Sequence, residues 1–342
     1  MVFPVTEHTV ETPRHRTFHL ACGDAEATPI IFVHGWPERC FSWRHQLPCF
    51  ASLGFRAIAP DMRGYGLSGV YPRHEDYALE HAVADMLELL DSFDREQAIW
   101  VGHDWGSPVV WALASHHPER CIGVANLCVP YFSEGFSPDS CTPYLDRNVY
   151  PPDAYPVGQW DYQLYYEESF DAATRSHEAD VRATVKALFR KGNPAVMGKP
   201  ARLSTTRKDG GWFGGTGRAP DLPLDTDVVT EADLDHYVTA LQANGFFGPN
   251  SWYMNHARNR AYAARALNEG RIHVPVLFLH GQYDATCETL KSRMAEPMRR
   301  DCERLTELVV PSGHWMAQEQ PALVNAGIAG WIARTLPSVW PE

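Results

Sequence analysis

The sequence has little positive charge. Of its 342 residues, 30 are Lys or Arg and 42 are Asp or Glu, so the net charge is -12 at pH 7. Nucleic acids and anionic membrane surfaces both attract basic surfaces, so we expect neither as a partner. No apolar run reaches the roughly 18 residues that a membrane-spanning helix needs, so we expect no membrane span.

The sequence also lacks paired cysteine motifs. Its 8 cysteines are scattered, without a C-x-x-C pair or a metal-ligand spacing. This pattern favours buried thiols in a reducing compartment over a disulfide framework. Residues 1–10 lack the basic and apolar segments of a signal peptide, so the expected location is the cytoplasm. We expect no metal and no cofactor.

Short apolar runs alternate with helical patterns in the first third of the chain and again near its end. Apolar residues make up 44% and charged residues 21% of the sequence, as in globular proteins. Continuous apolar strands separated by helices are typical of a parallel sheet that is covered on both faces. The predicted strands span residues 30–33, 55–59, 99–101, 123–129, 274–279 and 305–310.

This alternation stops between residues 131 and 262, where helical pieces and loops replace the strands. The segment holds 10 of the 14 tyrosines. We therefore predict an α/β core from residues 1–130 and 263–342, with residues 131–262 inserted as a helical cap. The glycine-rich stretch 209–217 follows no predicted strand and lacks a P-loop lysine, so it is predicted to be a flexible surface loop.

The sequence Gly-His-Asp-Trp-Gly at 102–106 carries the strongest local signal. It follows an apolar strand and precedes a helix, with Asp104 where G-x-S-x-G hydrolases have serine. Flanking glycines allow a tight turn that exposes the central side chain at the edge of the sheet. A helix-capping aspartate would need neither glycine. Asp104 is therefore the predicted nucleophile.

Three motifs together resemble an α/β-hydrolase of the epoxide hydrolase type. The elbow is one, His-Gly-Trp-Pro-Glu at 34–38 is the second, and the D-x-R-G-x-G-x-S sequence at 61–68 is the third. The resemblance implies an eight-stranded, mostly parallel sheet with a helical cap inserted after the sixth strand. It also implies a cis peptide bond between Trp36 and Pro37.

An aspartate nucleophile suits substrates that are attacked at a saturated carbon. A serine would leave an ether there, whereas Asp104 leaves an ester that water can hydrolyse. The water needs a general base, and His314 directly follows the last predicted strand, as the catalytic histidine of this fold does. Asp284, after the preceding strand, is predicted to orient His314.

Three further groups of residues complete the predicted site. The backbone N–H groups of Trp36 and Trp105 are expected to form the oxyanion hole. The resemblance also implies two tyrosines in the inserted segment that protonate the oxygen of the opened ring. They are Tyr162, in a Y-Q-x-Y pattern, and Tyr253, in an S-W-Y-x-N pattern. Trp36, Trp105, Gln163 and Trp315 are the predicted substrate-binding residues.

The sequence thus predicts an epoxide hydrolase that converts an apolar epoxide and water to a vicinal diol, as a monomer or homodimer. A haloalkane or haloacid dehalogenase on the same scaffold is the main alternative, because the Trp105 indole could donate to a halide. Residue 36 is Trp rather than the Asn common in haloalkane enzymes, and the tyrosine pair would then lack a role. A catalytically silent binding protein is the third interpretation, although no member of the triad is missing.

Overall fold

A computed structural model of the chain describes residues 3–341. Its eight-stranded sheet has the order β1-β2-β4-β3-β5-β6-β7-β8. The pairs β1–β2 and β2–β4 are antiparallel and the others are parallel, which confirms the predicted sheet. The strands are β1 (Thr6–Glu11), β2 (Arg16–Cys22), β3 (Pro29–Val33), β4 (Arg56–Pro60), β5 (Ala98–His103), β6 (Cys121–Leu127), β7 (Val276–Gly281) and β8 (Leu305–Val310).

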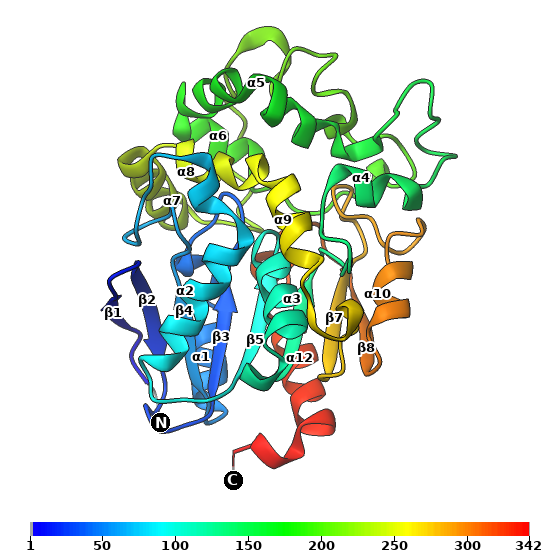
Figure 1. The fold of residues 1–342 in the computed structure, drawn as a ribbon. Coiled ribbons are helices and arrows are strands. Elements are labelled where there is room, and N and C mark those ends of the chain that lie inside the picture. Colours follow the sequence, from blue (N-terminus) through cyan, green and yellow to red (C-terminus); the bar gives the residue numbers. More distant parts are fainter. Residues whose placement is uncertain (1–2, 342) are drawn as a thin grey trace.

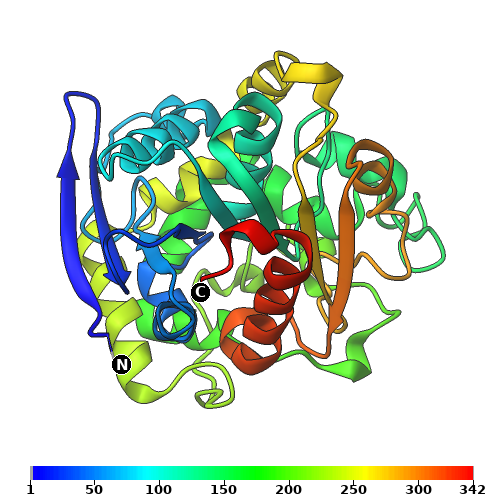
Figure 2. The same ribbon diagram turned by 90° about the horizontal axis from the view of Figure 1, so that it is seen from below.

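Helices cover both faces of this sheet. Figure 2 shows α2 and α3 on one face, with α1 and α12 on the other. Strands β3, β5 and β7 are buried at every position, which explains why they read as unbroken apolar runs. The helices of this part are α1 (Gln46–Ser52), α2 (Leu79–Asp91), α3 (Gly106–His116), α10 (Glu296–Asp301), α11 (Met316–Glu319) and α12 (Pro321–Thr335).

The six strand ranges predicted from the sequence did not include β1 or β2. Five of the six residues of β1 are exposed, because this strand lies at the edge of the sheet. Its sequence, TEHTVE, is mostly polar and lacks the apolar run by which the buried strands were predicted.

Residues 131–262 contain none of the eight strands. Their helices lie above the edge of the sheet in Figure 1, coloured green to yellow. Helix α7 begins with a capping box between Thr230 and Asp233, and the chain leaves it at Gly245, whose φ is 67°. The helices of this segment are α4 (Pro138–Cys141), α5 (Asp161–Glu178), α6 (Val181–Leu188), α7 (Glu231–Asn244), α8 (Phe247–Ser251) and α9 (His256–Ala263).

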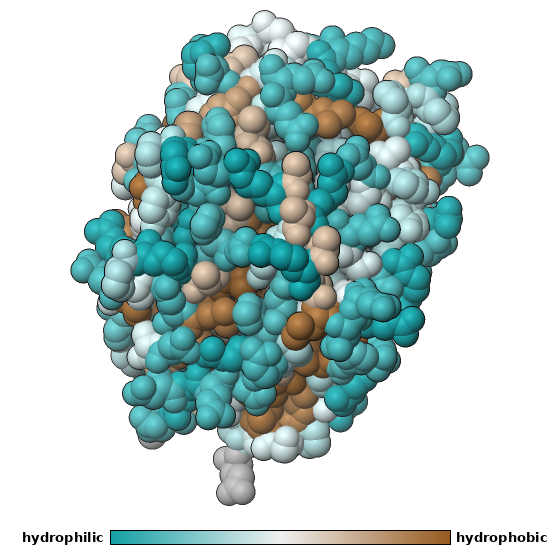
Figure 3. Space-filling model, viewed as in Figure 1, coloured by the Kyte–Doolittle hydropathy of each residue, from teal (hydrophilic) through white to brown (hydrophobic). Residues whose placement is uncertain are grey.

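The face drawn in Figure 3 is mostly hydrophilic, with hydrophobic residues in separate patches. Within residues 3–341, no helix combines the length and the apolar character needed to cross a membrane. All eight cysteines are free thiols, and seven of them are buried.

Candidate active site

Asp104 lies in the turn between β5 and α3, in a left-handed conformation with φ of 47°. Both flanking glycines are sterically required. A Cβ on Gly106 would clash with the carbonyl oxygen of Val33, and one on Gly102 would lie 2.6 Å from the Gly106 carbonyl oxygen. The turn therefore holds a strained aspartate at the carboxyl end of a buried strand, as the sequence predicts.

The two carboxylate oxygens of Asp104 have different partners. Oδ1 accepts a hydrogen bond of 2.6 Å from the backbone N–H of Trp36, and the Trp36–Pro37 peptide is cis as expected. Oδ2 lies 3.4 Å from His314 Nε2. Within residues 3–341 the Trp36 N–H is the one backbone donor bonded to this carboxylate. The backbone nitrogen of Trp105 and the Asp104 carboxylate both lie against Gly35. A Cβ built on Gly35 would lie only 2.6 Å from the Trp105 nitrogen and would also clash with Asp104.

His314 follows β8 and is held by Asp284, which follows β7. His314 Nδ1 lies 2.9 Å from Asp284 Oδ2, while Asp284 Oδ1 accepts hydrogen bonds from the N–H groups of Thr286 and Cys287. Burial raises the pKa of Asp284, but the charge and hydrogen bond of His314 outweigh burial and lower it. Asp284 is therefore an anion that orients the imidazole.

The pKa of His314 itself is raised well above its usual value. Burial alone would lower it, but the negative charge of Asp284 and the hydrogen bonds to Asp104 and Asp284 outweigh burial. In the free protein His314 is thus an imidazolium between two carboxylates.

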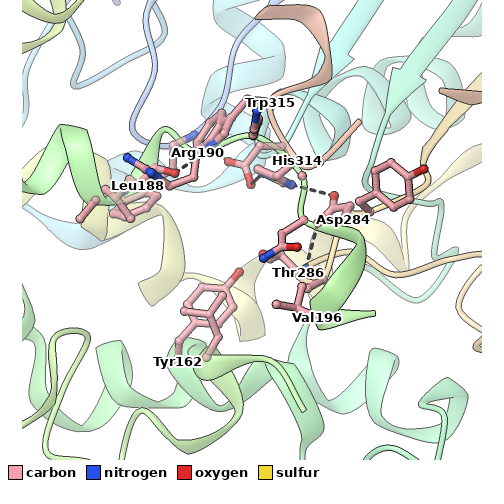
Figure 4. Close-up of a pocket in the computed structure, with 18 of the residues that line it drawn as sticks. Tyr162, Leu188, Arg190, Val196, Asp284, Thr286, His314 and Trp315 are labelled. Atoms are coloured by element: carbon pink, nitrogen blue, oxygen red, sulfur yellow. Dashed lines mark hydrogen bonds and ion pairs between the residues drawn. The ribbon is translucent and has the colours of Figure 1, made fainter. Parts of the chain in front are cut away.

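Tyr162 and Tyr253 face the same cavity as Asp104 and His314. Tyr162 lies in the first turn of α5, Tyr253 follows α8, and their ring centroids are 5.7 Å apart. Figure 4 shows the Tyr162 hydroxyl pointing into the cavity from the side opposite His314 and Asp284. Burial, reinforced by neighbouring groups that include the charge of Asp104, raises the pKa of both phenols well above its usual value. Both hydroxyls are therefore protonated and able to donate.

The cavity has a volume of about 280 Å³ and opens between the inserted segment and the sheet edge. Of the four predicted substrate-binding residues, Trp36 and Trp315 line it. Trp105 and Gln163 instead line a much smaller cavity that also touches Asp104 and Tyr162. The main cavity is lined by Trp36, Asp104, Tyr162, Ala187, Leu188, Arg190, Lys191, Gly192, Asn193, Val196, Leu203, Trp212, Tyr253, Tyr283, Asp284, Ala285, Thr286, Gly313, His314 and Trp315.

The prediction of a flexible surface loop at residues 209–217 is wrong for the centre of the loop. Trp212 and Phe213 are buried, 8% and 7% exposed, and Trp212 lines the cavity. Burial of large aromatic side chains stabilises the fold, and the glycines around them leave the backbone free to turn them inward. The aromatic pair among the glycines was the available signal.

A second buried acid–histidine pair supports the loop of His314. Glu38 Oε2 lies 2.7 Å from His103 Nδ1, and His103 Nε2 lies 2.7 Å from the backbone oxygen of His314. Both ring nitrogens of His103 thus face oxygen acceptors. Glu38 belongs to the 34–38 motif and His103 to the elbow, but the contact with the His314 loop was not predicted.

Two groups of side chains near His314 have the composition of a metal site: His103, Cys128 and His314, and Asp284, Cys287 and His314. Their polar atoms already bond one another or the chain. His103 contacts Glu38, Asp284 contacts His314, and the Cys128 thiol donates to the His314 carbonyl oxygen at 3.3 Å. These contacts occupy ligand atoms of His103, Asp284, Cys128 and His314.

Comparison with known proteins agrees with this fold. The sequence model of the alpha/beta hydrolase fold family matches residues 28–321. Bifunctional epoxide hydrolase 2 of Sus scrofa is 33% identical over 307 residues, covering 89% of this chain and 51% of the relative. The chain therefore spans about half the length of that relative. Epoxide hydrolase B of Mycobacterium tuberculosis is 32% identical, and the match covers 92% of this chain and 94% of that one.

A solved structure, an epoxide hydrolase from an endophytic Streptomyces, superposes with a TM-score of 0.79 at 29% identity, covering 98% of this chain and 96% of that one. The chain belongs to the alpha/beta hydrolase fold family, which confirms the predicted fold class. Within that family it belongs to the epoxide hydrolases, which confirms the resemblance seen in the sequence.

Proposed function

We propose that the chain hydrolyses an apolar epoxide to a vicinal diol through a covalent ester on Asp104. The observation that carries this proposal is the placement of Asp104. One of its oxygens is held by the Trp36 N–H, and two buried phenols face the same cavity. A carboxylate, rather than a hydroxyl, at the elbow suits attack on a saturated carbon.

In the first step Asp104 Oδ2 attacks one oxirane carbon, and the bond from that carbon to the ring oxygen breaks. The ring oxygen takes a proton from Tyr162 or Tyr253, which donate from the opposite side of the cavity. This step leaves an alkyl ester on Asp104, a free hydroxyl on the neighbouring carbon and one tyrosinate.

Ester formation also prepares His314 for the second step. Since the esterified Asp104 carries no charge, one of the groups that raise the pKa of His314 is lost, and the pKa falls. The proton that His314 releases neutralises the tyrosinate. Neutral His314, oriented by Asp284, is then a general base for water.

Water then gives a proton to His314 and attacks the ester carbonyl. The Trp36 and Trp105 N–H groups are the proposed donors to the negative oxygen of the tetrahedral intermediate. Collapse breaks the acyl C–O bond, the leaving alkoxide takes the proton from His314, and the diol is released. The new Asp104 carboxyl returns its proton to His314, so the cycle uses no cofactor or metal.

We also propose that residues 131–262 act as a cap over a core formed by residues 1–130 and 263–342. Both phenols come from this segment, whereas Asp104, Asp284 and His314 follow strands of the sheet. A monomer or homodimer in the cytoplasm, acting on a small apolar epoxide, is the proposed working form.

The test is turnover of styrene oxide beside a panel of bromoalkanes, with diol and bromide measured separately. We expect diol formation without bromide release. Bromide release without diol would reject the proposal in favour of a dehalogenase, and turnover of neither would favour a binding protein.

A further inference from the structure

Trp212 forms part of the wall of the cavity, although it comes from the glycine-rich loop. Its ring centroid lies 5.1 Å from that of Trp36 and 5.2 Å from that of Tyr162. Trp36 holds Asp104 through its backbone, and Tyr162 is the proposed acid. The indole therefore packs against both the residue that holds the proposed nucleophile and the residue that is the proposed acid.

The loop that carries Trp212 is fixed by backbone hydrogen bonds. Gly211 N–H donates to the Thr206 oxygen at 2.8 Å, and Gly214 N–H donates to the Gly211 oxygen at 3.0 Å. Gly211 has a φ of +130°, and a Cβ there would lie 2.9 Å from the Tyr165 hydroxyl oxygen. Glycine at 211 thus lets the chain pass Tyr165 and direct Trp212 inward.

We propose that Trp212 is a specificity-determining residue that limits the size of the substituent an epoxide carries on this side of the cavity. The inference rests on the proposed function, because it places the oxirane between Asp104 and the tyrosines. A group attached to an oxirane held there meets the Trp212 ring, which is buried and packs against Trp36 and Tyr162. Compact aryl and alkyl substituents fit, and a second large substituent does not.

The test compares kcat/KM for styrene oxide with kcat/KM for the bulkier trans-stilbene oxide in the unsubstituted chain and in four variants. Trp212→Ala removes the wall, and Trp212→Phe shortens it while keeping an aromatic ring. Gly211→Ala displaces Trp212 without removing it. Gly215→Ala is the matched control, because a Cβ at this exposed loop glycine contacts nothing within 4 Å.

We expect Trp212→Ala to raise the stilbene-to-styrene ratio by about tenfold or more, since pocket shape typically discriminates by 10- to 200-fold. Trp212→Phe and Gly211→Ala should raise the ratio less, and Gly215→Ala should leave it unchanged. Should Trp212→Ala fail to fold, as judged by Tm, Trp212→Phe decides the question. A ratio in the Trp212 variants equal to that of Gly215→Ala would overturn the inference while styrene oxide turnover upheld the proposed function. If the unsubstituted chain turns over no epoxide, the proposed function fails and this inference fails with it.

Discussion

His314 Nε2 lies 3.4 Å from Asp104 Oδ2, while the other ring nitrogen contacts Asp284 at 2.9 Å. The proposed nucleophile and the proposed base are thus electrostatically coupled. The contact with Asp104 helps to raise the pKa of His314. Because the two residues act in different chemical steps, mutation can separate those steps.

Replacing His314 should stop the cycle after its first step. In His314→Gln, Asp104 can still open the epoxide, but no base activates water, so the ester accumulates. We expect kcat to fall about 100- to 10,000-fold. Intact mass spectrometry should show one substrate mass added per chain. Asp104→Ala is the control that should show no adduct, and an adduct in that variant would contradict the assignment of the nucleophile.

Removing the two phenols should slow ring opening and leave ester hydrolysis intact. We expect Tyr162→Phe and Tyr253→Phe each to lower the single-turnover rate of alkylation by about 100-fold, and the double variant to lose it. Tyr237→Phe is a matched control, since this buried tyrosine bonds Ser42 and Gln318 outside the cavity. Equal rates in the Tyr162 and Tyr237 variants would reject the acid role.

The coupling of Asp104 and His314 predicts a pH effect on stability. The pKa of His314 is higher in the folded state than its unfolded value of about 6.5, so protonated His314 stabilises the fold. This contribution is fully present below about pH 6.5 and is lost as pH rises through the folded-state pKa. Asp104→Asn removes one of the groups that raise the pKa of His314. The decline of Tm above about pH 6.5 should therefore be smaller in Asp104→Asn than in the unsubstituted chain. Identical pH profiles of Tm would contradict the coupling.

The Glu38–His103 pair should matter for both stability and rate. Burial raises the pKa of Glu38, but the charge and hydrogen bond of His103 outweigh burial and lower it to about 2. Its stabilising contribution is present above the unfolded pKa of about 4.3 and is lost as pH falls toward the folded value. Because a broken buried pair typically costs about 3–5 kcal/mol, Glu38→Gln should lower the free energy of unfolding by a similar amount.

Since His103 also contacts the backbone oxygen of His314, we expect kcat of Glu38→Gln to fall with little change in KM. Glu303→Gln provides the control, because Glu303 pairs with His273 at the surface, where both side chains are about half exposed. A Glu38→Gln variant as stable and active as Glu303→Gln would show that the buried pair supports neither property.

The parts of the molecule that were predictable from sequence have strong local patterns. Buried parallel strands such as β3 and β5 are unbroken apolar runs, and the Asp104 elbow needs glycines at fixed positions. The sequence predicts helices over residues 180–190 and 231–243, and α6 (Val181–Leu188) and α7 (Glu231–Asn244) fall within a residue or two of these bounds. Short-range periodicity and turn chemistry determine these features, so one sequence suffices.

The parts that were missed depend on contacts between distant segments. The edge strand β1 is mostly polar because one of its sides meets solvent. Trp212 is buried only because Trp36 and Tyr162, far away in the chain, form its surroundings. The contact between His103 and the His314 backbone likewise spans 211 positions. Local sequence patterns do not encode such packing.

The most direct test of the covalent mechanism follows the oxygen atoms in ¹⁸O-labelled water. With enzyme in excess over styrene oxide, the diol of the first turnover should carry unlabelled oxygen from Asp104. After many turnovers, the peptide containing Asp104 should carry the label. Labelled diol in the first turnover, with an Asp104 peptide that stays unlabelled, would mean direct attack by water and would rule out a covalent ester on Asp104.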